Sequence, residues 1–194
     1  MFSKLLGGKV CLVTGGAGGL GKVIAQAFLN SGAKVVVSDI NQEPLKQCES
    51  EFPSQDFRAV NADVTKEESG SRLFAEVVGQ FGKLDVLVNN AGIMDRFDGA
   101  GLLGLTKNTA ASYGKKGIRC TIVLAGFMET NISTSFTGGI NQTGMERIQK
   151  LMSSVEAEAC NLEQMGETCA CLCSDGARVL NGAEIVADNC WTSY

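Results

Sequence analysis

The amino-acid sequence predicts one α/β domain, spanning 1–194, in which parallel strands and helices alternate to form a doubly wound sheet. Two observations support this fold class. Short apolar runs at 10–13 and 35–37 are continuous rather than alternating, which is typical of parallel strands that helices cover on both faces. Between such runs, as at 20–28, apolar residues recur at offsets of three and four, which indicates amphipathic helices. A chain of 194 residues is long enough to bury one substantial core.

The first strand-helix-strand unit covers residues 9–40. Its first strand ends at Thr14, where a glycine-rich turn begins, and its second strand ends at Asp39. Gly32 follows the helix, at a position where a left-handed backbone conformation commonly ends a helix. The apolar face of this helix consists of Leu20, Val23, Ile24, Ala27 and Phe28.

The same alternation continues along the rest of the chain. Asn41 is placed to cap a short helix, and Thr65 with Glu68 has the spacing of a capping box at the start of a longer one. The polar stretch 133–144 has no apolar periodicity and is predicted to be a mobile loop. Further strands are predicted at 57–62, 84–88, 118–124 and 183–187, and further helices at 102–113, 144–153 and 162–173.

The composition excludes several classes of function. The chain has no histidine, which removes Ser-His-Asp hydrolysis, Cys-His thiol chemistry and the common histidine-ligated zinc and iron sites. A net charge of -4 with scattered lysines offers no basic surface for nucleic acid. No uncharged apolar run approaches the roughly 20 residues of a membrane span, and the apolar part of the N-terminus is too short for a signal peptide. We therefore expect a cytoplasmic protein that binds neither nucleic acid nor a membrane.

The eight cysteines lie mostly in apolar runs, so we expect reduced, mostly buried thiols rather than disulfides. Three of them form the pattern Cys169-x-Cys171-x-Cys173. On a helix the middle cysteine points away from the other two, and the sequence shows no fourth ligand. We therefore predict helix packing at these positions and no metal site.

A glycine-rich turn follows the first strand, with the sequence Thr14-Gly15-Gly16-Ala17-Gly18-Gly19-Leu20-Gly21. Glycines allow close backbone approach, and the helix N-terminus offers free N–H groups to the pyrophosphate of a dinucleotide. Asp39 lies 18 residues beyond Gly21, near the spacing of the acid that hydrogen-bonds the adenosine ribose. A carboxylate there repels a 2′-phosphate, and neither the turn nor the residues next to Asp39 include Arg or Lys, so NAD is predicted rather than NADP. Two simpler interpretations stay open: a merely structural turn, and a solvated loop acid.

Three motifs together resemble those of the classical short-chain dehydrogenases/reductases, whose domain is a Rossmann-type sheet. Thr14 to Gly21 matches the TGxxxGxG cofactor turn of that family, Asp63-Val64 resembles its adenine-contacting pair, and Asn89-Asn90-Ala91-Gly92 matches its NNAG motif. The resemblance implies an NAD(P)-dependent oxidoreductase that interconverts a small-molecule alcohol and ketone. Gly126 and Thr130 fit the family's loop near the nicotinamide carboxamide, and the implied cofactor-binding residues are Gly15, Gly19, Leu20, Gly21, Asp39, Asp63, Val64, Asn90, Ala91, Gly92 and Thr130.

The catalytic residues of that family are not found in this chain. The family uses a serine after its fifth strand and a Tyr-x-x-x-Lys pair, whose tyrosine exchanges a proton with the substrate oxygen. The chain contains two tyrosines, Tyr113 and Tyr194, and neither begins Tyr-x-x-x-Lys. In the sequence Tyr113-Gly114-Lys115-Lys116-Gly117, a glycine stands where the lysine is required. We therefore predict no catalytic residue and no turnover by the chain as written.

The resemblance implies an internal deletion near residues 100–101, which would explain this loss. In the family, a segment similar to Gly101-Leu102-Leu103-Gly104-Leu105-Thr106 closely follows the catalytic lysine, whereas here it begins nine residues after Gly92. The resemblance thus implies a sheet that is one strand-helix unit short, with about 60 residues lost from a domain of about 250. The strand at 118–124 is then free to dock beside the strand at 84–88.

Two other interpretations of the whole chain are retained. One is a non-catalytic module that binds a dinucleotide or a protein partner, and the other is a truncated splice or gene-model product. The family usually forms homo-oligomers through helices that flank the proposed gap. We therefore expect this chain to be monomeric or to assemble differently, with apolar surface left uncovered.

Overall fold

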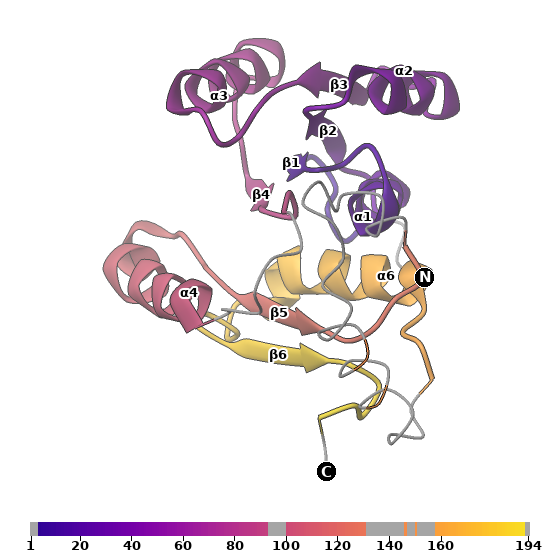
Figure 1. Cartoon of the computed structure of the whole chain (residues 1–194). Coiled ribbons are helices and arrows are strands. Elements are labelled where there is room, and N and C mark those ends of the chain that lie inside the picture. The colour runs from indigo at the N-terminus through magenta and orange to yellow at the C-terminus, as the bar shows by residue number, and fades with distance from the viewer. Residues whose placement is uncertain (1–3, 93–99, 131–145, 147–149, 151–157, 193–194) are drawn as a thin grey trace. The chain divides into compact units, whose positions relative to one another are not determined.

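The structure is a computed structural model that describes residues 4–92, 100–130, 146, 150 and 158–192 (Figure 1). The chain divides into two compact units, each considered by itself: unit 1 comprises Met1–Gly92 and Leu162–Ala177, and unit 2 comprises Ile93–Asn161 and Arg178–Tyr194. The predicted loop at 133–144 lies outside the described residues. So does the predicted helix at 144–153, apart from Glu146 and Lys150.

Unit 1 contains a parallel sheet of four strands in the order β3-β2-β1-β4. The strands are β1 (Val10–Thr14), β2 (Lys34–Asp39), β3 (Phe57–Asn61) and β4 (Val86–Val88). The helices of this unit are α1 (Gly19–Asn30), α2 (Gln42–Glu51), α3 (Glu67–Phe81) and α6 (Leu162–Cys173), followed by the short helix η3 (Asp175–Ala177). This arrangement confirms the predicted Rossmann-type parallel sheet.

Helices cover the centre of this sheet on both faces. Cys11 and Val37, whose side chains point to one face, pack in a core cluster with Phe28 of α1 and with residues of α2 and α6. Leu12, on the opposite face, packs in a second cluster with Leu73 of α3. The continuous apolar runs of β1 and β2 are buried because each face has its own helices, as the sequence predicts.

Helix α6 completes unit 1 from a distant part of the sequence, and it lies beside α1 (Figure 1). Gly166 of α6 permits this close packing, because a Cβ atom there would lie 2.9 Å from the carbonyl oxygen of Val23 in α1. Cys169 and Cys173 pack against the α1 core cluster, whereas Cys171 is exposed. The side chain of Cys171 therefore points away from those of Cys169 and Cys173, as predicted for a helix that packs on one side.

The predicted capping box at the start of α3 is wrong. The N-cap residue of α3 is Lys66, and no side chain caps the helix. The helix begins one residue later than the capping box requires, and the hydroxyl of Thr65 donates a hydrogen bond of 2.6 Å to Asp63 Oδ1 in the preceding turn. Asn41 is the N-cap of α2, as predicted, but its side chain also makes no capping hydrogen bond.

Unit 2 contains α4 (Ala100–Tyr113), the short helix η1 (Gly114–Lys116) and a parallel pair of strands, β5 (Ile122–Ala125) and β6 (Glu184–Ala187). Asn181 connects its parts: its Nδ2 donates to the carbonyl of Ala110, and its Oδ1 accepts from the N–H of Cys120. The expected docking of the strand at 118–124 beside β4 joins residues of the two units and stays a prediction. Within the described residues β5 pairs with β6, and the strand begins only at Ile122.

Replacing Gly166 by alanine is expected to destabilise the chain by about 1–3 kcal/mol, because the new methyl group collides with α1 backbone that has no room to move. The measurement is the free energy of unfolding in urea. Gly79→Ala in α3 is the matched control: nothing lies within 4 Å of its Cβ position, so alanine should stabilise the helix by about 0.5–1 kcal/mol. Equal effects of the two substitutions would contradict the packing role of Gly166.

Candidate functional site

Ten of the eleven predicted cofactor residues gather at one edge of the unit 1 sheet, where all four parallel strands have their carboxyl ends. β1 leads into Gly15, β2 ends at Asp39, β3 leads toward Asp63, and β4 leads into Asn90. The strand order reverses between β1 and β4, which is the position where ligands bind in open α/β sheets. Thr130, the eleventh residue, is half-buried in unit 2, so the structure does not join it to the other ten.

A hydrogen-bonded link between Thr14 and Asn90 fixes the glycine turn to the end of β4. The side-chain Nδ2 of Asn90 donates to the carbonyl oxygens of Thr14 and Gly15, at 3.1 and 3.0 Å. In return, the Thr14 hydroxyl oxygen accepts from the backbone N–H groups of Asn90 and Ala91, both at 3.1 Å. This Thr14–Asn90 link pairs backbone groups that no sheet ladder satisfies.

Two glycines make the link possible. Gly15 has φ +62, and a Cβ atom there would lie 2.8 Å from Ala91 Cα. A Cβ atom on Gly21 would collide with the carbonyl of Gly15 and would lie 2.5 Å from Asn90 Nδ2. The turn, the start of α1 and the NNAG segment can therefore approach each other only without side chains at these two positions.

The N-terminus of α1 is open to a ligand. Its N-cap residue, Gly18, contributes no side chain, no side chain caps the helix, and nothing lies within 4 Å of the Gly18 Cβ position. The first turn contains no acidic residue. Free N–H groups and the positive end of the helix dipole can therefore receive the phosphates of an anionic ligand at this point.

Asp39 lies at the end of β2, and one of its two carboxylate oxygens accepts a hydrogen bond. Its Oδ1 accepts a hydrogen bond of 3.0 Å from the N–H of Asn41, and no hydrogen bond or ion pair engages Oδ2 within the described part of the chain. Asn61, on the neighbouring strand β3, donates to the backbone carbonyls of Asp39 and Ile40 and so fixes this corner. A half-buried carboxylate with one free oxygen can accept hydrogen bonds from a pair of sugar hydroxyls.

Asp63 and Val64 follow β3 at the same edge. The hydroxyl and backbone N–H of Thr65 donate to the Asp63 carboxylate and, with a weaker contribution from Lys66, hold its pKa below the ordinary value. The Asp63 N–H donates to the hydroxyl of Ser69, which ties the segment to α3. Val64 is exposed, and so is Ile40 after the adjacent strand β2, so two apolar side chains are available to a flat aromatic ring.

Sequence reasoning missed three residues of this edge. The hydroxyl of Thr14, the amide of Asn61 and the side chain of Ile40 have no place in the cofactor set predicted above. Thr14 could have been found from its position in the glycine motif. The roles of Asn61 and Ile40 depend on the pairing of β2 with β3, which cannot be predicted from the local sequence.

Tyr113, the one tyrosine within the described residues, lies in unit 2. It ends α4, and its side chain is 44% exposed. Lys116 lies over its ring, with the Nζ atom 5.1 Å from the ring centre. The side chain of Lys116 thus packs on the face of the Tyr113 ring at a surface turn, and this contact is structural.

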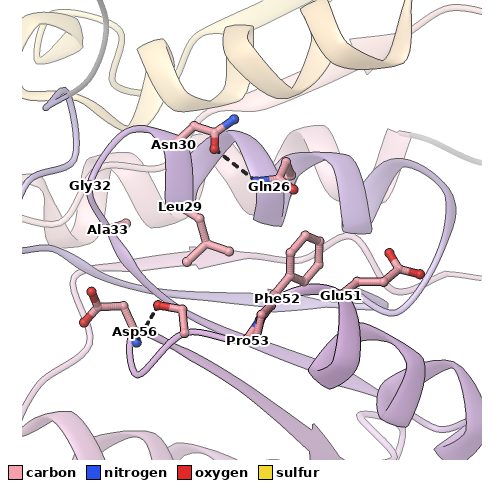
Figure 2. Close-up of a pocket in the computed structure, with 10 residues that line it drawn as sticks. Gln26, Leu29, Asn30, Gly32, Ala33, Glu51, Phe52, Pro53 and Asp56 are labelled. Carbon is pink, nitrogen blue, oxygen red and sulfur yellow. Dashed lines mark hydrogen bonds between the residues drawn. The ribbon is translucent and has the colours of Figure 1, made fainter.

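A pocket of unit 1 lies away from this edge (Figure 2). It has a volume of about 320 Å³ and lies at the opposite end of β2 and β3, between the end of α1 and the α2–β3 connection. Leu29 and Phe52 line it together with Gln26, Asn30 and Asp56. None of the predicted cofactor residues lines this pocket. The pocket and the sequence motifs therefore indicate different places in unit 1.

The cysteines and acidic residues do not form a metal centre in the part of the chain that the structure describes. All eight cysteines are free, but only Cys11 and Cys48 are fully buried, so the expectation of mostly buried thiols is only partly met. Burial raises the pKa of the Cys169 thiol to about 12, with a further contribution from Cys173, so this thiol is unreactive at neutral pH. No helix of the described residues has the length and apolar character to cross a membrane.

Both halves of the chain match known families. Residues 9–100 match the family described as short chain dehydrogenase, and residues 99–192 match the one described as Enoyl-(Acyl carrier protein) reductase. The short chain dehydrogenase/reductase dpfgG of Gibberella zeae is 34% identical over 257 residues, covering 97% of this chain and 95% of the relative. The 3beta-hydroxysteroid dehydrogenase 2 of Eggerthella lenta is 26% identical over 258 residues, covering 99% and 98%.

Solved structures show the same fold. A hydroxysteroid dehydrogenase from Escherichia coli has a TM-score of 0.78 at 23% identity, covering 96% of this chain and 97% of that one. A 3-ketoacyl-(acyl-carrier-protein) reductase from Brucella melitensis complexed with NADH has a TM-score of 0.79 at 22% identity, covering 95% and 98%. These likenesses establish a Rossmann-type α/β fold with a parallel sheet.

Replacing Asn90 by alanine is expected to lower the free energy of unfolding by about 1–3 kcal/mol, because the carbonyls of Thr14 and Gly15 lose their hydrogen-bond donor. Urea unfolding measures the loss. Asn89→Ala is the matched control, since Asn89 is exposed and its side chain makes no hydrogen bond within the described residues; its effect should stay within about 0.5 kcal/mol. A loss of similar size in the control would contradict the role of the Thr14–Asn90 link.

Proposed function

The chain belongs to the short-chain dehydrogenase/reductase family of oxidoreductases, and on that premise we propose that unit 1 binds NAD at the carboxyl edge of its sheet. The observation that carries this proposal is the pairing of an open α1 N-terminus with the free carboxylate oxygen of Asp39 at one edge. The first suits the pyrophosphate and the second suits the adenosine ribose. Family membership and the relative solved with NADH support a nicotinamide dinucleotide as the ligand class.

Electrostatics favour NAD over NADP in this proposal. A 2′-phosphate would place up to two negative charges next to Asp39, whose Oδ1 is already engaged as an acceptor. No Arg or Lys occurs in the turn from Thr14 to Gly21. The first lysine of α1, Lys22, is committed to an ion pair with Glu51 at 2.6 Å. Lys66, which follows Asp63 at this edge, is likewise ion-paired, with Asp63 at 3.4 Å. Both lysines therefore already have a carboxylate partner.

We propose that the bound cofactor undergoes no turnover in this chain. NAD supplies a hydride acceptor or donor, and the family needs a positioned tyrosine and lysine to move the accompanying proton. The sequence contains no Tyr-x-x-x-Lys, and Tyr113 is engaged with Lys116 at the end of α4. If another group does supply the proton, the substrate class is a small-molecule alcohol or ketone, in keeping with the family.

A missing internal segment near 100–101 is part of the same proposal. Since 97% of 194 residues is about 188, an alignment of 257 residues leaves about 69 positions at which this chain has no residue. The two family matches meet at residues 99–100, which supports a break at that point. The same break supports the alternative of a truncated splice or gene-model product. The intact Thr14–Asn90 link favours a chain that still folds and binds the dinucleotide. A cytoplasmic location stays part of the proposal.

NAD is expected to raise the melting temperature of the full chain, and NADP to raise it less at equal concentration. Asp39→Asn should weaken NAD binding by about tenfold or more, because charged hydrogen bonds to the ribose are lost. It should also bring the melting temperatures measured with NAD and with NADP closer together. The control is Asp56→Asn, at the opposite end of the sheet, which should bind NAD as the wild type does. No stabilisation by NAD, together with a polydisperse sample in light scattering, would favour the truncated-product alternative.

Incubating the purified chain with NAD or NADH and a panel of secondary alcohols and ketones is expected to give no change in absorbance of the reduced nicotinamide. Tyr113→Phe should behave as the wild type in this assay. Turnover that disappears in Gly19→Val or Asp39→Asn but persists in Tyr113→Phe would overturn the claim of inactivity and leave the cofactor site intact.

A further inference from the structure

The thiol of Cys48, in α2, lies directly beneath the glycine turn. Its side chain is fully buried, and its Sγ donates a hydrogen bond of 3.6 Å to the carbonyl oxygen of Ala17. The two residues are 31 positions apart in the sequence, so a helix outside the strand-turn-helix motif holds the turn from within unit 1. The cofactor residues predicted from the motifs do not include this thiol.

The glycine turn enters the core of unit 1 and returns to the surface within three residues. Gly16 and Ala17 are buried, whereas Gly18 is exposed. The N–H of Gly16 donates to the carbonyl oxygen of Ser38 at 3.0 Å, which attaches the first buried residue to β2. Cys48 attaches the second buried residue to α2. The exposed residue that follows is therefore presented by two contacts in the core.

The hydrogen bond from Cys48 sets the direction of the peptide group between Ala17 and Gly18. This peptide is trans, so its carbonyl and its N–H point in opposite directions. Because the Ala17 carbonyl points inward to α2, the Gly18 N–H points out of the core, at the start of α1. No hydrogen bond engages this N–H within the described residues. It is a donor that a bound anion can use.

Helix α2 also holds the other parts of the proposed dinucleotide site. Its N-cap residue, Asn41, donates its N–H to Asp39 Oδ1 at 3.0 Å. At its other end, Glu51 forms an ion pair of 2.6 Å with Lys22 of α1. Cys48 lies between these two contacts along the helix. One helix therefore fixes the acid at the end of β2, the glycine turn and the start of α1 relative to each other.

We propose that Cys48 is a positioning residue for the dinucleotide, and that its thiol orients the glycine turn so that the Gly18 N–H donates to the pyrophosphate. This inference rests on the proposed binding of NAD to unit 1 and adds to it a residue from α2. Burial raises the pKa of the Cys48 thiol, although the charge of Lys22 opposes this effect. The thiol therefore keeps its proton at neutral pH and remains a hydrogen-bond donor.

Two matched pairs of substitutions separate the hydrogen bond from the packing at this position. Cys48→Thr and Cys48→Val have nearly the same shape, and so do Cys48→Ser and Cys48→Ala, but only the first of each pair has a hydroxyl donor. Titration calorimetry measures the binding of ADP and of NAD to the full chain, and melting curves show that each variant is folded. ADP carries the adenosine ribose and the pyrophosphate without the nicotinamide, so it tests unit 1 by itself.

Cys48→Val and Cys48→Ala should each weaken ADP and NAD binding by about three- to tenfold, as expected for the loss of one modest hydrogen bond. Cys48→Thr and Cys48→Ser should stay within about twofold of the wild type, even where their melting temperatures fall, because the hydroxyl supplies the donor. Cys11→Val is the control. Cys11 is fully buried in the same core cluster but makes no hydrogen bond to the glycine turn in the described structure, so both affinities should be unchanged.

Three results would contradict this role of Cys48. One is equal affinity for ADP in the wild type, Cys48→Val and Cys48→Ala. Another is a loss in the hydroxyl variants as large as that in their partners, because packing rather than the hydrogen bond would then decide the affinity. In both cases the wild type still binds, and the proposed cofactor site stands. A wild type that binds neither ADP nor NAD overturns that site and this inference together.

Discussion

The Thr14–Asn90 link is the interaction on which the site depends. β1 and β4 are neighbours in the sheet although 76 residues separate these two side chains in sequence, and the link ties their carboxyl ends together. It also uses both hydrogens of the Asn90 amide, so this side chain is a structural element rather than a free donor to substrate. With the turn fixed, α1 begins in one direction, and its open N-terminus faces the edge where Asp39 ends β2.

The sequence could predict the parts of unit 1 that depend on local pattern. The strands at 10–13 and 35–37 and the helix beginning near Leu20 follow from apolar periodicity, and Gly32, with φ +83, ends that helix as predicted. The predicted cap of α3 failed because the motif does not fix the residue at which the helix begins. With Lys66 as its N-cap, α3 begins one residue later than the capping box requires, and the Thr65 hydroxyl donates to Asp63 Oδ1 in the preceding turn. The spacing of Thr65 and Glu68 cannot show where the first helical turn starts.

The pairing of strands that lie far apart in the sequence was the second feature that local patterns could not predict. The pairing of β5 with β6 depends on backbone partners outside each local segment, and side chains such as Asn181 add to it. The cofactor edge shows the same division. Its glycines and acids could be read from the motifs, whereas the contribution of Asn61 requires knowing that β3 pairs with β2 in a particular register. The pocket of about 320 Å³ could not have located the site either, because phosphate recognition at a helix N-terminus depends on open N–H groups more than on enclosed volume.

The predicted cofactor residues and the proton-transfer residues of the family belong to different stretches of sequence. Ten of the eleven predicted cofactor residues lie between Gly15 and Gly92, and α6 closes the core of that same unit from the far end of the chain. A segment missing after Gly92 would therefore remove the catalytic tyrosine and lysine without removing a strand from between β1 and β3.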